Sequence, residues 1–235
     1  MKEEIFVART AIPRRELDAA LQTLCEDTLS LSGQVEKMLH ESVQSLKTQD
    51  LDLGQSVVDA DDNIDEGAIA IEKAAESIIA RHQPVASDLR RVISTMRIVR
   101  ELERIADLSV NIARATLKMN EPLLKPLIDI PRMASIAQEM VRNSLNCLIE
   151  GSEEGAWRVR CRDDEIDALH WQIFRELLTY MIDDPRSIHR AIPLLFVARH
   201  LERVGDHATN IAEIVIYFLT GDRVTSTSDT GFPGE

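Results

Sequence analysis

The chain has 235 residues, of which 44% are hydrophobic and only 4% are aromatic, and its formal net charge is −13. This length allows one large or two small domains with a packed core, and the scarcity of aromatic residues favours helices over a β-rich fold. The negative charge argues against a nucleic-acid partner and an anionic membrane surface, because both need clustered Lys and Arg.

Signals for a cell compartment are few. The three cysteines, Cys25, Cys147 and Cys161, show no C-x-x-C spacing and are typical of reduced thiols. The first 20 residues are mostly polar or charged, and no apolar run reaches the roughly 18 residues of a membrane span. We therefore expect a soluble, cytoplasmic protein without direct membrane insertion.

In chain order, apolar periodicity and capping residues predict six long helices. The first three span about 13–48, 50–82 and 85–119, and the proline-rich segment EPLLKPLIDIP at 121–131 separates them from the rest. A fourth helix runs to about Glu150, a fifth spans about 153–182, and a sixth about 186–219. The polar tail from residue 222 is expected to be disordered.

An internal repeat organises these helices. The stretch RELERIADLSVNIAR at 100–114 returns as RHLERVGDHATNIAE at 199–213, and earlier positions recur with an offset of 102. The expected fold is therefore all-α, with two tandem repeated three-helix bundles made of six long antiparallel helices. We assign residues 12–120 to the first repeat, 121–221 to the second, and 222–235 to the tail.

Each repeat carries two acid pairs with a spacing of four residues, which places both acids on one face of a helix. The first acid of each pair also falls in an apolar seam, where an unpaired carboxylate is costly. Neighbouring helices lie about 8–10 Å apart, so four carboxylates could converge in each repeat. The four pairs are Asp61/Asp65, Glu103/Asp107, Asp163/Asp167 and Glu202/Asp206.

A cation would remove the repulsion among these acids, and oxygen ligands suit hard ions such as Mg, Ca, Mn or Fe(III). Asn111 and Asn210, one turn further along, could support the site with an amide oxygen or a bound water. In the alternative interpretation the acids are solvated, or they pair with the arginines beside them: Arg100, Arg104, Arg199 and Arg203.

The sequence contains few signs of other metal sites or of catalytic motifs. His170 follows Asp167 at the spacing of a di-iron ligand pair, but only once, and its counterpart in the first repeat is Ala68. No phosphate-binding loop or nucleophile-and-base arrangement is visible, so no catalytic residue is predicted. Trp157 and Trp171 are interpreted as packing residues, and the six histidines as solvated or satisfied.

Together, the tandem repeat, the segment LLKPLIDIPRMA at 123–134 and the four acid pairs resemble the PhoU family over residues 12–220. The resemblance implies a cytoplasmic homodimer of six-helix subunits, with metal ions (Mg, Mn, Fe, Ca or Zn) on the acid pairs in some members. It also implies a non-enzymatic negative regulator of the phosphate-starvation response and of phosphate uptake. Its expected partners are the ATPase subunit of the phosphate ABC transporter and the sensor histidine kinase of the phosphate regulon.

Two other functions stay open at this point. One is a metal-dependent hydrolase built on the carboxylate clusters, which the missing nucleophile and base disfavour. The other is a structural helical bundle without metal, in which the acids are simply solvated.

Overall fold

The computed structural model describes residues 14–119 and 121–224, and within these ranges the chain is helical and contains no strand. This confirms the predicted all-α fold. The elements are α1 (Arg14–Thr48), α2 (Leu51–Asp59), α3 (Asp61–His82), α4 (Ser87–Lys118), α5 (Asp129–Glu150), α6 (Glu153–Cys161), α7 (Asp163–Asp183), the 3-10 helix η1 (Pro185–Ser187) and α8 (Ile188–Thr220). Positions 225–235 of the predicted tail lie outside the described residues.

The second and fifth predicted helices are each broken once, which is a correction to the prediction. The breaks fall at Ala60 and Arg162, which are separated by the repeat offset of 102. Both residues keep a right-handed backbone but with ψ close to zero (−14° and −7°), so no glycine or proline reveals the break. As a result, Asp61 and Asp163 begin new helices, where the helix dipole favours a negative charge.

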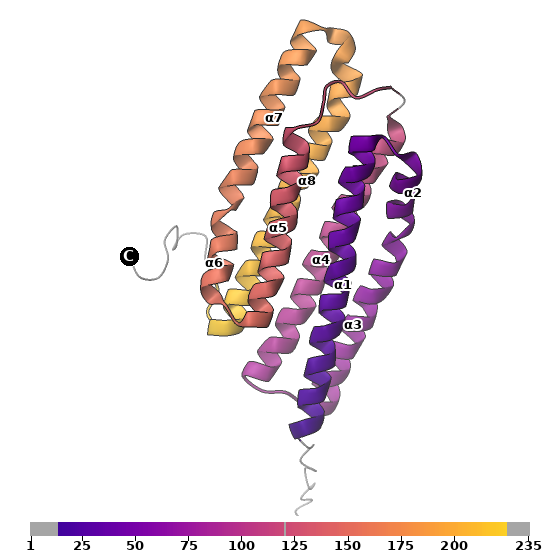
Figure 1. The fold of residues 1–235 in the computed structure, drawn as a ribbon. Helices are drawn as coiled ribbons and strands as arrows, with labels where there is room; N and C mark the ends of the chain where they lie inside the picture. Colours follow the sequence, from indigo (N-terminus) through magenta and orange to yellow (C-terminus); the bar gives the residue numbers. More distant parts are fainter. Residues whose placement is uncertain (1–13, 120, 225–235) are drawn as a thin grey trace, which may run out of the picture.

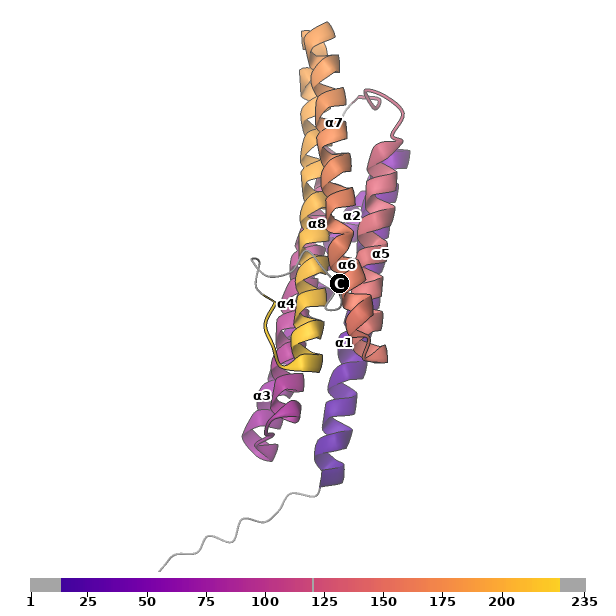
Figure 2. The same ribbon diagram turned by 90° about the vertical axis from the view of Figure 1, so that its left-hand side faces the viewer.

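The two repeats lie side by side along the length of an elongated molecule (Figures 1 and 2). α1, α3 and α4 pack together in the first repeat, and α5, α7 and α8 in the second. α4 packs along α8 and α1 along α5, so the two bundles share one continuous core. An ion pair between Arg142 and Glu36 (2.9 Å) also joins α5 to α1 at the surface.

The predicted apolar seams form most of this core. In α4, Val92, Val99, Ala106, Val110 and Ala113 are buried, as the spacing predicted. The core stops short of the free end of the α7–α8 hairpin. There Tyr180 and Ile188 are 39% and 40% exposed, because no other helix among the described residues covers that side of the hairpin.

The two tryptophans differ. Trp157 is 7% exposed and packs in the core as predicted, whereas Trp171 is 59% exposed, so its assignment as a packing residue was wrong. Trp171 lies on the outer side of α7, where its only aromatic neighbours in the described chain are His170 and Phe174.

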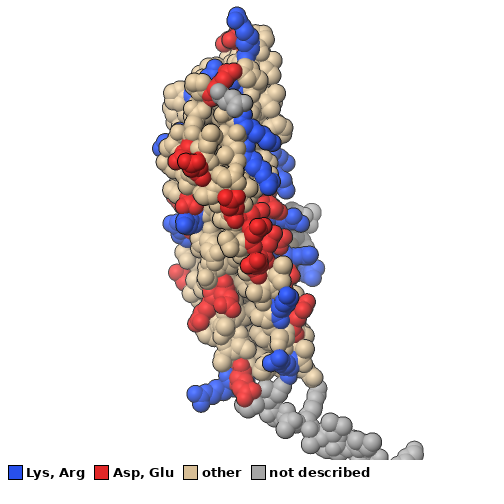
Figure 3. All heavy atoms as spheres, turned by 90° about the vertical axis from the view of Figure 1, so that its right-hand side faces the viewer, with Lys and Arg blue, Asp and Glu red and all other residues tan. Residues whose placement is uncertain are grey.

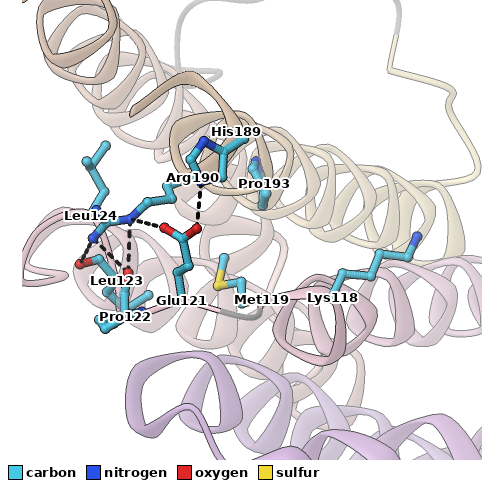
Figure 4. Close-up of a pocket in the computed structure, with 9 residues that line it drawn as sticks. All are labelled: Lys118, Met119, Glu121, Pro122, Leu123, Leu124, His189, Arg190 and Pro193. Carbon is cyan, nitrogen blue, oxygen red and sulfur yellow. Dashed lines mark hydrogen bonds and ion pairs between the residues drawn. The ribbon is translucent and has the colours of Figure 1, made fainter. Parts of the chain in front are cut away.

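The proline-rich linker between the repeats is held against α8. Arg190 donates hydrogen bonds to the carbonyl oxygens of Pro122 (2.7 and 3.1 Å) and Leu123 (2.8 Å), and His189 contacts Glu121 at 3.1 Å. Figure 4 shows these groups around a cavity of about 150 Å³. Lys125, also in the linker, forms an ion pair with Glu176 of α7. The proline-rich segment that was predicted to separate the two repeats is therefore held against α7 and α8 by hydrogen bonds and ion pairs.

The two repeats differ in the length of their first helix. α1 has 35 residues and α5 has 22. The α7–α8 hairpin consequently rises past the N-terminal end of α5 in both ribbon views (Figures 1 and 2).

Candidate metal centre

The acid pairs lie on two adjacent helices of each repeat, as the sequence predicted. The first acid of each pair is half-buried, whereas the second is exposed. The first acid of each pair therefore lies at the edge of the core, and the second faces solvent. Four residues advance a helix by about 40° more than one full turn, which is enough to rotate the second carboxylate toward solvent.

The second acidic site comprises Asp163, Asp167, Glu202 and Asp206, whose charges repel one another. Burial, then the charges of Asp206 and Asp167, raise the pKa of Asp163 to about 6, while the Thr209 hydroxyl opposes this rise. Burial and Asp206 likewise raise the pKa of Glu202, against the opposing charge of Arg199. The acids of α7 and α8 therefore form one electrostatic cluster.

A glycine brings α7 and α8 together beside this cluster. A Cβ at Gly205 would lie 2.8 Å from Cδ1 of Ile166 and 3.5 Å from Oδ1 of Asp163. Glu202 pairs with Arg199 through Oε1, but its Oε2 is buried and has no hydrogen-bond partner among the described residues. A buried carboxylate oxygen without a partner is costly, so this site favours uptake of a proton or a cation.

The first acidic site comprises Asp61, Asp65, Glu103 and Asp107. Burial, then the charges of Asp65 and Asp107, raise the pKa of Asp61, and the guanidinium of Arg114 opposes them. α3 and α4 thus bring their acids together as α7 and α8 do, but here a nearby arginine supplies part of the neutralising charge.

Two of the four arginines considered from the sequence do pair with acids of these sites. Arg104 contacts Asp107 at 3.2 Å, and Arg199 pairs with Glu202. Arg100 and Arg203 form no ion pair within the described part of the chain. Ion pairs with these arginines therefore account for one acid in each site.

The two asparagines proposed as supporting residues are placed differently. Asn111 is half-buried on α4. Asn210 donates a hydrogen bond to Glu101 of α4 (3.0 Å), and His207 contacts the same carboxylate oxygen at 2.7 Å. Burial alone would raise the pKa of Glu101, but these two partners bring it below its ordinary value.

Sequence reasoning missed this Glu101 network. It joins α4 of the first repeat to α8 of the second, and no repeated spacing marks it, because Leu108 stands at the position equivalent to His207 and His200 at the position equivalent to Glu101. It does satisfy His207, as the interpretation of the histidines expected.

The acidic sites can attract a hard cation, but their side chains do not enclose one as they stand. No group of three or more His, Cys, Asp or Glu side chains within residues 14–119 and 121–224 is arranged to hold a metal ion. The unpaired oxygen of Glu202 and the raised pKa of Asp163 nevertheless fit a site that lacks positive charge. Rotation of the exposed Asp167 and Asp206 side chains would be needed to complete a ligand set.

The surface carries charges of both signs. On the face shown in Figure 3, acidic side chains gather near the middle of the molecule's length, with basic side chains above and below them. Among the described helices, none has both the length and the apolar character that crossing a membrane requires.

Comparisons with a family model and with individual proteins point to the same family. The family model described as "PhoU domain" matches residues 28–116 and 130–215. The "Phosphate-specific transport system accessory protein PhoU homolog" of Rhizobium meliloti is 39% identical over 206 residues, 87% of each chain. The protein of the same name from Aquifex aeolicus is 40% identical over 205 residues, 87% of this chain and 93% of that one.

Two solved structures share the fold. The crystal structure of PhoU from Pseudomonas aeruginosa has a TM-score of 0.84 and 36% sequence identity, covering 87% of this chain and 99% of that one. The phosphate transport system regulatory protein PhoU from Streptococcus pneumoniae also has a TM-score of 0.84, with 28% identity and 89% and 99% coverage. The tandem bundles, the repeated acid pairs and these matches over most of the chain make this protein a member of the PhoU family.

Proposed function

We propose that this protein is a non-enzymatic negative regulator of the phosphate-starvation response and of phosphate uptake. The observation that carries the proposal is the match to accessory proteins of the phosphate-specific transport system over 87% of both chains. In this role the protein acts in the cytoplasm as a homodimer. It links the ATPase subunit of the phosphate ABC transporter to the sensor histidine kinase of the phosphate regulon.

We further propose that the two acidic sites bind metal ions. Asp163, Asp167, Glu202 and Asp206 would hold an ion in the second repeat, and their counterparts Asp61, Asp65, Glu103 and Asp107 would hold one in the first. A bound cation would neutralise these carboxylates and tie α7 to α8, or α3 to α4. The all-oxygen ligand set favours hard ions such as Mg, Mn, Ca or Fe over Zn.

The regulatory role is tested in a strain that lacks this protein and carries a reporter for phosphate-starvation genes. The reporter should be expressed in phosphate-rich medium, and the wild-type gene should restore repression. Normal repression in the deletion strain would contradict the proposal. A variant with Asp163→Asn and Glu202→Gln, expressed at wild-type level, then shows whether the second acidic site contributes to repression.

The metal proposal has its own test, which is elemental analysis of the protein purified without added metal or chelator. An ion present in wild type and lost from the Asp163→Asn, Glu202→Gln variant would support it. The competing function, a metal-dependent hydrolase, predicts turnover of phosphate esters by the metal-loaded protein. Robust turnover abolished by Asp206→Ala would replace the adaptor function with an enzymatic one.

A further inference from the structure

The first turns of α1 have no helical counterpart in the second repeat. Residues 14–26 align with 116–128 at the repeat offset of 102, yet α5 begins only at Asp129. Two of the aligned positions are prolines, which disfavour a helix because proline lacks the backbone N–H and clashes with the preceding turn. The linker at 121–128, which we call the strap, therefore stands where the first repeat has a helix.

In the first repeat this part of α1 fills a groove between α3 and α4. Leu17, Leu21 and Leu24 are at most 8% exposed there. Arg14 donates hydrogen bonds to Asp88, close to the start of α4, at 2.5 and 3.3 Å. The groove thus holds a helix through apolar side chains at steps of four and three, and through a base at the N-terminal end of that helix.

The equivalent groove of the second repeat, between α7 and α8, is filled less completely. Ile78 of α3 is 6% exposed, whereas Tyr180 at the equivalent position of α7 is 39% exposed. Leu89 of α4 is half-buried, whereas its equivalent Ile188 is 40% exposed. Apolar surface that a helix covers in the first repeat is therefore open near the tip of the α7–α8 hairpin. We call this the docking groove.

Two neighbouring cavities line the docking groove beside the strap. The cavity of about 150 Å³ in Figure 4 is bordered by Met119, Leu124 and Pro193 among other residues. A second cavity of about 320 Å³ lies nearer the hairpin tip, is bordered by Tyr180, and shares Leu124 and Arg190 with the first. A cavity of about 150 Å³ is large enough to hold a benzene-sized group. Each cavity can therefore take an apolar side chain from outside.

The strap is held more by polar contacts than by burial. Arg190 donates hydrogen bonds to two of its carbonyl oxygens. The leucines of the strap are only half-buried, unlike those of the equivalent part of α1. Polar contacts near the surface stabilise less than the burial of several large apolar side chains. A helix that buries such side chains in the docking groove can therefore displace the strap.

Charges at the two ends of the docking groove specify the helix that fits. Asp183 borders the larger cavity at the tip and Lys118 borders the smaller one, and among the described residues neither forms an ion pair. In the first repeat the acid at the tip is Asp88, which binds Arg14 at the N-terminal end of α1. A helix entering in the same direction would place a base beside Asp183 and an acid toward Lys118.

We propose that the docking groove binds an amphipathic helix of a partner protein, about three turns long, which displaces the strap. The apolar residues of this helix follow one another at i, i+4 and i+7, as Leu17, Leu21 and Leu24 do in α1. A base lies at its N-terminal end and an acid toward its C-terminal end. This inference rests on the adaptor role in the proposed function, and it adds the surface used and the kind of segment that the partner contributes.

The test is photo-crosslinking in cells from the docking groove of the full chain. The variant Tyr180→p-benzoylphenylalanine replaces the wild-type protein in its own host, which is grown in phosphate-rich and in phosphate-poor medium. Mass spectrometry then identifies the crosslinked segment. We expect a segment of another protein with the apolar spacing and the terminal charges given above. The inference is overturned by a segment without that pattern, by crosslinks only to this chain or to lipid, or by no crosslink in either medium.

A second substitution shows whether the crosslink depends on the docking groove. Ile188→Arg places a charge on the wall of the groove and should lower the crosslink yield roughly tenfold or more. The matched control is Ile182→Arg, because Ile182 is 71% exposed and lies about 200° around α7 from Tyr180. The control should keep the yield, and both variants should keep the helical content. Equal losses in the two variants would overturn the inference.

Displacement of the strap has its own variant, Arg190→Met, which removes the hydrogen bonds to the strap. The crosslink yield should rise about threefold or more, because a larger fraction of the protein then has an open groove. An unchanged or lower yield would overturn the displacement. Repression of the phosphate-starvation reporter is measured separately in the same strains. A chain that represses without this crosslink keeps the proposed function and loses only this inference.

Discussion

The two repeats place the same acid pairs on equivalent helices but surround them with different neighbours. In the first repeat Arg114 lies close enough to Asp61 to oppose the rise of its pKa, whereas the second repeat has Glu213 at that position. In the second repeat Gly205 replaces Ala106, so α7 approaches α8 beside Asp163. One duplicated pattern has therefore produced a partly neutralised site and a charge-deficient one.

This difference predicts that an added cation occupies the second acidic site first. A ligand held only by the folded state at about 100 times its dissociation constant adds roughly 2.7 kcal/mol of stability. Mn²⁺ should raise the Tm of chelator-treated protein, and Asp163→Asn with Glu202→Gln should remove most of that rise. The matched first-site variant, Asp61→Asn with Glu103→Gln, should keep more than half of it. The opposite ranking would show that the Arg114 charge does not control affinity.

The close approach at Gly205 gives the second-largest expected effect. Gly205→Val should destabilise the protein by about 2 kcal/mol, since the new side chain overlaps the fully buried Ile166. Urea unfolding measures the change. Gly33 of α1 is the control, because a Cβ there meets no atom within 4 Å. If Gly33→Val costs as much as Gly205→Val, helix propensity rather than helix contact explains the loss.

The charge deficit at Asp163 predicts a pH dependence. Its folded-state pKa of about 6 lies above the ordinary 3.8, so the folded protein retains a proton that the unfolded chain releases. With respect to this group, stability is fully present below pH 3.8 and falls as the pH rises through 6. Without metal, Asp163→Asn should therefore stabilise the protein at pH 7.5 by about 1 kcal/mol, allowing for solvent screening.

Thermal melts of wild type and the Asp163→Asn variant at pH 5 and pH 7.5, both in chelator, measure this effect. The stabilising effect should shrink at the lower pH, where the wild-type carboxylate is largely protonated. An equal effect at both pH values would mean that the amide helps for reasons other than charge.

The smallest effect concerns Arg114. Arg114→Gln should raise the pKa of Asp61 further, because the opposing charge is removed, and should change stability by less than about 0.5 kcal/mol. Carboxyl NMR titration of the metal-free protein reports this pKa directly. Lys118→Gln, one turn further along α4, is the control and should leave the Asp61 titration unchanged. An unchanged Asp61 in the Arg114 variant would remove the proposed cause of the difference between the two sites.

The helical architecture was predictable from the sequence because apolar spacing and proline positions act locally. Asp50 caps α2 by accepting a hydrogen bond from the backbone N–H of Leu53, and Gly151 ends α5 in a left-handed conformation. The breaks at Ala60 and Arg162 were not predictable, since neither residue disfavours a helix. Their matching positions show that they belong to the repeated backbone rather than to a particular side chain.

The candidate site was only partly predictable for the same reason. Repeated four-residue spacing is sufficient to locate all eight acids on two helices per repeat, and it also places the first acid of each pair at the edge of the core. Spacing along one helix carries no information about a second helix. The approach at Gly205, the partnerless oxygen of Glu202 and the Glu101–His207 contact between repeats therefore came only from packing.

By itself, the sequence determined the all-helical class, the duplication and the positions of the acid pairs, because these depend on local periodicity that repeats along one chain. Only the tertiary structure decided which acids face the core, which repeat lacks positive charge, and that Trp171 faces outward. Burial and electrostatic interaction depend on distances between helices, and those distances are fixed when the helices pack.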